Sequence, residues 1–128
     1  MKNAIIYTRV STDEQADKGY SLRYQEERLR QYCSIQKINV VEHFKDDFSA
    51  KTFERPAFKQ LKEYVLMNKK NIDCILFVKW DRFSRNTSDS YNMIKYFFKL
   101  GITVQAIEQP IDVKIPEQKI LLAFYLAY

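Results

Sequence analysis

The chain contains only two glycines, Gly19 and Gly101, among its 128 residues. Glycine-rich phosphate loops and dinucleotide-binding fingerprints need several closely spaced glycines, so both are excluded. The single histidine, His43, and the two cysteines, Cys33 and Cys74, are too few for a zinc site of the Cys/His type. No apolar run reaches the roughly eighteen residues of a membrane span, and the start turns polar too early for a secretory signal. We therefore expect a cytoplasmic protein with reduced thiols and no membrane segment.

The chain is rich in apolar and basic residues. Apolar residues make up 46% of it and aromatic residues 15%, which can fill one sizeable core, and the length is typical of one domain. We therefore expect a single domain over residues 1–128. The formal net charge of +5 favours an anionic partner such as nucleic acid, although many proteins with a basic surface have no such partner.

Short apolar segments alternate with helix-like segments along the chain. The apolar segments cover residues 4–7, 38–44, 72–80 and 102–107. Between them, helical spacing predicts helices over about 22–36, 56–65 and 86–100. Pro56 suits the first position of the second helix, and Gly101 stands where the third should stop. The alternation predicts an α/β fold, with a mostly parallel central sheet of four to five strands and helices on both faces.

Residues 116–128 open like a helix and are apolar on nearly every face. A helix of this kind is usually buried, so we expect more of the protein or a partner subunit to cover it. The pattern is interpreted as the start of a long helix.

The first predicted strand ends in a polar cluster. Tyr7, Arg9 and Ser11 alternate along it and so project from one face. They stand at the carboxyl end, outside which open α/β sheets form their ligand crevice. On spacing alone, Ser11 would be a strand-end serine that bonds nearby backbone groups. The adjacent arginine makes it a candidate nucleophile.

The third apolar segment ends in a second polar cluster, which contains Lys79, Asp81, Arg82 and Arg85. Because parallel strands deliver their carboxyl ends to one edge of the sheet, we expect this cluster to meet the first, which holds Tyr7, Arg9 and Ser11. Guanidiniums beside a hydroxyl can bind a phosphodiester, stabilise its transition state and favour the deprotonated serine without a metal. An ordinary surface ion pair is the alternative for Asp81 and Arg82.

Two other functions remain open from the residues alone. A metal-dependent nuclease would use carboxylates, and those available are Asp13, Glu14, Asp46, Asp47 and Asp81. A non-catalytic nucleic-acid-binding domain would use the arginines for binding only. A histidine-based hydrolase is disfavoured, because the only histidine falls within the second predicted strand.

Three ordered blocks of residues resemble a known family. The first comprises Tyr7, Arg9, Val10, Ser11, Thr12 and Gln15, followed by Gly19-Tyr20-Ser21-Leu22 and Gln25. The second comprises Asp46, Ser49, Arg55 and Pro56, and the third comprises Asp81, Arg82 and Arg85. Together they are similar to the catalytic domain of the serine recombinases, which include resolvases, invertases and the larger serine integrases and transposases. The chain departs from the pattern at Ala50 and Asp47, where family members often have glycine, but neither change removes a charged group.

The resemblance implies a reaction that needs neither metal nor cofactor. Ser11 would attack a phosphodiester of double-stranded DNA, become joined to the 5′ phosphate and release a 3′ hydroxyl. After strand exchange within a synaptic homotetramer, that hydroxyl would attack the phosphoserine. It further implies a homodimer held by the long helix that begins near residue 116. We would expect the domain alone to bind DNA weakly, in a salt-sensitive way, and not to recombine sites.

The resemblance also implies roles for individual residues. Arg9, Arg82 and Arg85 would bind the scissile phosphate. Asp81 would orient an arginine or pass a proton to the leaving oxygen, and Tyr7 would support Arg9. The residues that would position the phosphate or support this set are Gln15, Gln25, Asp46, Ser49 and Arg55. Lys79 is a further candidate for phosphate binding, from its place in the second cluster.

Overall fold

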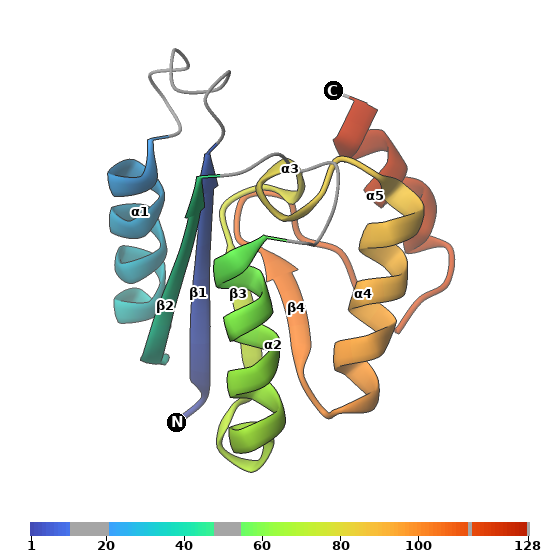
Figure 1. The fold of residues 1–128 in the computed structure, drawn as a ribbon. Coiled ribbons are helices and arrows are strands. Elements are labelled where there is room, and N and C mark those ends of the chain that lie inside the picture. Colours follow the sequence, from blue (N-terminus) through green and yellow to red (C-terminus); the bar gives the residue numbers. More distant parts are fainter. Residues whose placement is uncertain (11–20, 48–54, 113, 128) are drawn as a thin grey trace.

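The computed structural model describes residues 1–10, 21–47, 55–112 and 114–127 (Figure 1). Its strands are β1 (Asn3–Val10), β2 (Asn39–Asp47), β3 (Cys74–Phe77) and β4 (Thr103–Ala106). They form one sheet in the order β2-β1-β3-β4, and each neighbouring pair is parallel. The expected parallel α/β sheet is therefore confirmed, with four strands in the described part of the chain.

Helices cover both faces of the sheet, as expected. They are α1 (Leu22–Ile35), α2 (Pro56–Asn68), α3 (Trp80–Phe83), α4 (Thr87–Lys99) and α5 (Gln118–Ala127), and a short 3-10 turn, η2 (Lys69–Asn71), follows α2. The alternation of β1 explains the layering, because Ala4 and Ile6 pack with α1 while Ile5 and Tyr7 pack with α2 and α4. Figure 1 shows α1 on one side of the sheet and α2 on the other.

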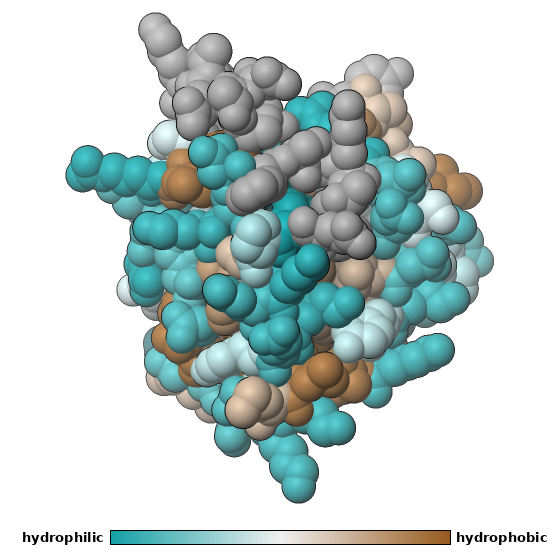
Figure 2. All heavy atoms as spheres, in the orientation of Figure 1, coloured by the Kyte–Doolittle hydropathy of each residue, from teal (hydrophilic) through white to brown (hydrophobic). Residues whose placement is uncertain are grey.

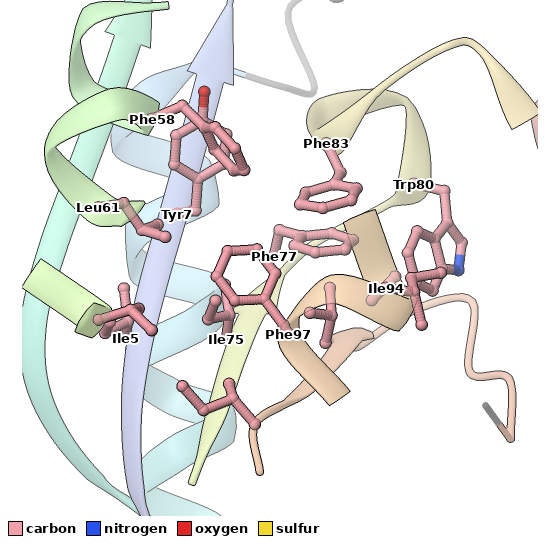
Figure 3. Close-up of a cluster of buried hydrophobic side chains, with 14 of the residues drawn as sticks. Ile5, Tyr7, Phe58, Leu61, Ile75, Phe77, Trp80, Phe83, Ile94 and Phe97 are labelled. Atoms are coloured by element: carbon pink, nitrogen blue, oxygen red, sulfur yellow. The ribbon is translucent and has the colours of Figure 1, made fainter. Parts of the chain in front are cut away.

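Aromatic side chains fill the core on the α2 side (Figure 3). The Phe58 ring lies near three others, with its centroid 5.6 Å from that of Tyr7, 5.8 Å from that of Phe83 and 6.4 Å from that of Phe97. Phe77 and Phe83 stack with their centroids 4.7 Å apart. This cluster joins β1, α2, β3, α3 and α4, so it fixes the short helix α3 against the end of the sheet.

The helix boundaries follow the sequence signals closely. Asn86 caps α4, because its side chain accepts a hydrogen bond from the Asp89 N–H at 3.0 Å. Gly101 follows α4 with φ of +82°, a left-handed conformation that glycine adopts without strain. The cysteines also agree with expectation, since Cys33 and Cys74 are buried and neither forms a disulfide. Burial raises the pKa of Cys74 to about 12, which keeps this thiol protonated.

The third apolar segment differs from the expected strand over 72–80. β3 ends at Phe77, and Trp80 opens the four-residue helix α3. Trp80 and Phe83 are three residues apart and both fully buried, so they lie on one face of a helical turn that also carries the polar residues Asp81 and Arg82. A turn of four residues is too short to show a helical period in the sequence.

The C-terminal helix α5 is largely exposed, so the cover that we expect from more of the protein or from a partner subunit stays a prediction. Of its residues, only Leu122 is fully buried. Ile120 and Phe124 are 75% and 58% exposed, and with Glu117 and Leu121 they line a shallow groove on the surface of α5. Within the described ranges, no helix is long and apolar enough to cross a membrane. The face that carries α2 is mostly hydrophilic (Figure 2).

A chain of polar contacts ties β1, β2 and α1 together. The hydroxyl of Thr8 lies 2.8 Å from Nε2 of His43, and Nδ1 of His43 lies 3.5 Å from a carboxylate oxygen of Glu26. Arg30 donates to the same carboxylate at 2.8 Å. Burial lowers the pKa of His43; Arg30 and Lys45 lower it further, while Glu26 and an exposed neighbouring glutamate, residue 42, oppose the shift.

This shift predicts a loss of stability in mild acid. Because the folded state binds the His43 proton less readily than the unfolded chain does, stability should fall as pH drops below about 6.5, the ordinary histidine value. Urea unfolding of wild type and His43→Gln between pH 7 and 5 should show a shallower decline for the variant. The pKa of Glu26 is lowered, so the contribution of this carboxylate to stability is lost only at a lower pH than that of His43. Equal slopes for the two proteins would contradict this explanation.

Candidate active site

The guanidinium of Arg9 joins two segments that are far apart in the sequence. Arg9 lies near the carboxyl end of β1 and is fully buried. Its Nε donates to the carbonyl of Arg82 at 3.0 Å, and its Nη2 donates to the carbonyl of Asp81 at 2.7 Å. The structure therefore brings Arg9 together with α3, at the carboxyl edge of the sheet, as the topology of parallel strands led us to expect.

Gln25 of α1 holds the backbone of Arg9 in place. Its side-chain oxygen accepts a hydrogen bond from the Arg9 N–H at 3.2 Å, and its amide nitrogen donates to the Arg9 carbonyl at 2.9 Å. Gln25 is itself fully buried. A buried amide with both ends bonded to one residue fixes the end of β1 against the first helix.

Asp81 and Arg82 form an ion pair that is anchored on β1. Nε of Arg82 lies 3.0 Å from Oδ1 of Asp81, and its Nη1 donates to the Arg9 carbonyl at 3.3 Å. Burial pushes the pKa of Asp81 upward, but the hydrogen bond from Arg82 and the charges of Arg82, Arg85 and Arg9 outweigh it and lower the pKa. Arg82 is buried, whereas Arg85 is exposed just after α3. The three guanidiniums thus place positive charge around the carboxylate of Asp81.

Asp46, in the second block of the resemblance, holds the start of α2. Its carboxylate accepts the hydroxyl of Tyr7 at 2.7 Å and the backbone N–H groups of Ala57 and Phe58 at 2.9 and 3.0 Å. Arg55 is the N-cap residue of α2 and its side chain does not cap the helix, so the cap comes from β2. Burial raises the pKa of Tyr7 well above its ordinary value, which keeps this hydroxyl a donor.

Arg55 connects α2 to the far end of α3. Its guanidinium carbon lies 5.6 Å from the centroid of the Tyr7 ring and 5.4 Å from that of Phe58, and Nη2 donates to the carbonyl of Phe83. Burial lowers the pKa of Arg55, although a guanidinium stays charged at any physiological pH. Arg9 and Arg55 therefore hold three consecutive carbonyls, those of residues 81–83.

The remaining candidates fall into two groups. Lys79 is half-buried and directly precedes α3. Ser11, Gln15 and Ser49 lie outside the described residues, as do Asp13, Glu14 and Ala50.

The carboxylates proposed for a metal site do not come together in the described part of the chain. Asp46 bonds Tyr7 and α2, Asp81 bonds Arg82, and Asp47 is exposed. Across residues 1–10, 21–47, 55–112 and 114–127, no group of three or more His, Cys, Asp or Glu side chains could hold a metal ion.

One contact near the site was not expected from the sequence. Gln109 lies after β4 and accepts a hydrogen bond from the backbone N–H of Trp80, the residue that opens α3. Only its place beyond a strand's carboxyl end could have drawn attention to it.

Comparison with known proteins agrees with this geometry. The family model for the resolvase N-terminal domain matches residues 4–128. The crystal structure of the N-terminal catalytic domain of TP901-1 integrase is 31% identical, with a TM-score of 0.80 over 98% of this chain and 92% of that one. A resolvase-family site-specific recombinase from Streptococcus pneumoniae shares the fold at 24% identity, with a TM-score of 0.75 over 99% of this chain and 84% of that one.

A phage protein is also similar over part of the chain. It is an uncharacterized immunity region protein of Bacillus phage phi105, 40% identical over 65 residues, which are 50% of this chain and 79% of that protein. Taken with the family match over residues 4–128, these findings show that the chain belongs to the resolvase N-terminal domain family. It is a site-specific recombinase catalytic domain of the serine recombinase class, and proteins of this class act on DNA.

The Asp46 cap predicts a specific stability loss. Asp46→Ala leaves a buried hydroxyl and two helix N–H groups without their acceptor, so the free energy of unfolding should fall by about 2–4 kcal/mol. Asp47→Ala, at an exposed position of the same strand, should change it by less than about 0.5 kcal/mol. Urea denaturation measures both. A similar small effect for the two variants would show that the cap contributes little.

Proposed function

We propose that Ser11 is the nucleophile that cleaves and rejoins DNA in this recombinase domain. It follows β1 directly, and β1 carries Arg9 to the edge of the sheet where α3 presents Asp81 and Arg82. This contact between β1 and α3 is the main support for the proposal, because it places guanidiniums next to the strand end that Ser11 follows. The serine ester conserves the energy of the phosphodiester, so religation needs no ATP.

The arginines would supply preorganised positive charge. Arg9 and Arg82 are buried and held by backbone carbonyls or a carboxylate, so little reorganisation is needed when negative charge develops on a phosphate. Arg85 is exposed at the same edge and can meet a DNA backbone that arrives from solvent. Gln25, Arg55 and Asp46 would act by fixing the elements that carry these groups, and Lys79, Gln15 and Ser49 would assist phosphate binding.

Two roles are open for Asp81, orienting an arginine or passing a proton to the leaving oxygen, and its environment favours the first. Its lowered pKa keeps the carboxylate ionised near neutral pH, which suits an acceptor that orients Arg82. A carboxylate in this state is a poor proton donor to a leaving oxygen. Tyr7 would likewise support the site through Asp46 rather than take part in proton transfer.

The partner would be double-stranded DNA, handled by a homodimer that pairs into a synaptic homotetramer. The exposed apolar residues of α5, Ile120 and Phe124, support a subunit contact along this helix, which would be the start of the long dimerisation helix. A protein with this role would work in the cytoplasm, where the nucleoid is. We further infer that the reaction needs neither metal nor cofactor.

A covalent adduct tests the proposal without knowledge of the target site. The complete protein that carries this domain is incubated, in EDTA, with fragments of the genome that encodes it and is then denatured. Ser11 should carry a 5′-linked nucleotide by mass spectrometry, and sequencing of the attached DNA should reveal the target. Ser11→Ala should give no adduct.

The competing functions give different results in the same assay. A metal-dependent nuclease would leave protein-free ends that disappear in EDTA, and a non-catalytic binding domain would never cut a strand. An adduct that persists in Ser11→Ala would end the proposal.

The variant Arg85→Ala tests a role in the reaction without disturbing the fold. Because Arg85 is exposed, its loss should change the free energy of unfolding by less than about 0.5 kcal/mol. Loss of one charge-stabilising donor should slow adduct formation by about 10²- to 10³-fold. Lys70→Ala is the matched control, since Lys70 is exposed in η2 before β3, at the opposite edge of the sheet, and should react normally. Equal rates for Arg85→Ala and wild type would exclude a role for Arg85 at the phosphate.

A further inference from the structure

The first residue of α3, Trp80, is bonded to a residue that lies outside the three blocks, Gln109. The backbone N–H of Trp80 donates to Oε1 of Gln109 at 2.9 Å, and the indole Nε1–H donates to the Gln109 carbonyl at 2.8 Å. Gln109 thus accepts from both N–H donors of the residue that opens α3. The contact spans 29 residues of sequence.

A helix as short as α3 cannot fix its own orientation. It has four residues, and the side chain of its N-cap residue, Lys79, makes no capping hydrogen bond. The backbone bonds that close it include those from Arg82 N–H to the Lys79 carbonyl and from Ser84 N–H to the Trp80 carbonyl. A single helical turn is not stable in isolation, so contacts with the rest of the domain must decide its orientation.

Two kinds of outside contact are present around Trp80. Its ring packs edge-on against Phe77, with centroids 4.9 Å apart, and lies 6.0 Å from that of Phe83 (Figure 3). Such packing tolerates small rotations, whereas hydrogen bonds are directional. Gln109 therefore supplies directional contacts at the start of α3, where the Lys79 side chain provides no cap.

Gln109 is itself firmly held. The chain before it continues along β3, because Ile107 N–H donates to the Phe77 carbonyl at 2.8 Å and Glu108 N–H donates to the Val78 carbonyl at 3.1 Å. Beyond it, the hydroxyl of Tyr125 in α5 donates to the carbonyl of residue 110 at 3.2 Å. A rigid support of this kind can transmit a fixed geometry to α3.

We propose that Gln109 is a positioning residue for the recombination chemistry. It would act through Trp80 on Asp81 and Arg82, and through their carbonyls on the guanidinium of Arg9. Gln109 touches neither DNA nor the reacting atoms in this role. The inference rests on the proposed function for its catalytic consequence, and on the contacts of α3 alone for its structural part.

The test uses two substitutions of similar size in the complete protein. Gln109→Met removes the acceptor, and Gln109→Glu keeps an oxygen for the Trp80 N–H. At saturating DNA, Gln109→Met should form the Ser11 adduct about 10- to 100-fold more slowly, because misplacement by about 1 Å costs rates of this order. The DNA concentration at half-saturation should change by less than about threefold, and Gln109→Glu should recover most of the rate.

A control in the connection between β4 and α5 distinguishes the positioning of α3 from a general loosening of that connection. Gln118 accepts the Asp112 N–H at 3.1 Å and belongs to α5, so Gln118→Ala disturbs the connection without touching Trp80. It should keep a normal rate. Loss of rate in both Gln109→Met and Gln118→Ala, or a normal rate in Gln109→Met, would overturn the proposal, as would failure of Gln109→Glu to recover.

A separate measurement keeps the inference testable if the proposed chemistry fails. Trp80 is the only tryptophan among the 128 residues, so tryptophan emission, excited at wavelengths that the nine tyrosines do not absorb, reports on α3. Gln109→Met should shift the emission and increase quenching by acrylamide, while Gln118→Ala should do neither. If wild type forms no adduct, the proposed function fails, and the fluorescence still decides whether Gln109 positions α3. Unchanged emission and quenching in Gln109→Met would refute the positioning role.

Discussion

The site depends on one buried cation, the guanidinium of Arg9, and on where its hydrogen bonds go. A guanidinium cannot lose its proton, so placing it in the interior requires acceptors that compensate for lost water. The carbonyls of Asp81 and Arg82 supply them and draw α3 onto the end of β1. A group that would be costly in an apolar core thus becomes the link between two distant segments. The other elements of the site are arranged around this link.

The supporting residues share a pattern, in which a polar side chain bonds the backbone of another element. Gln25 bonds both backbone groups of Arg9, and Asp46 bonds two N–H groups at the start of α2. Arg55 bonds the carbonyl of Phe83, and Gln109 bonds the N–H of Trp80. These contacts satisfy groups at strand and helix ends that regular structure leaves unbonded. Five elements are fixed relative to one another in this way, with the aromatic core beneath them.

Much of this arrangement could be predicted from the sequence, and the exceptions have physical reasons. The alternation of short apolar segments with helix-like segments identified the strands. The rule that parallel strands deliver their carboxyl ends to one edge of the sheet predicted that Arg9 would approach Arg82. The helix α3 was missed because a single turn of four residues is too short to show a helical period in the sequence. The roles of Asp46 and Gln109 in capping were missed because each reaches a helix from elsewhere in the chain, and such contacts have no local signature. Sequence reasoning finds residues that belong to a site more readily than it finds those that hold the site together.

The reliance of Arg9 and Arg55 on carbonyls of residues 81–83 has an evolutionary consequence. Every amino acid offers the same carbonyl, so these anchors do not themselves dictate which side chains stand at residues 81–83. The side chains there are left for other tasks, which are the ion pair of Asp81 with Arg82 and the packing of Phe83 against Phe77. Selection at residues 81–83 should therefore act through those tasks, whereas at Arg9 and Arg55 it should act on the donors of the anchoring bonds themselves.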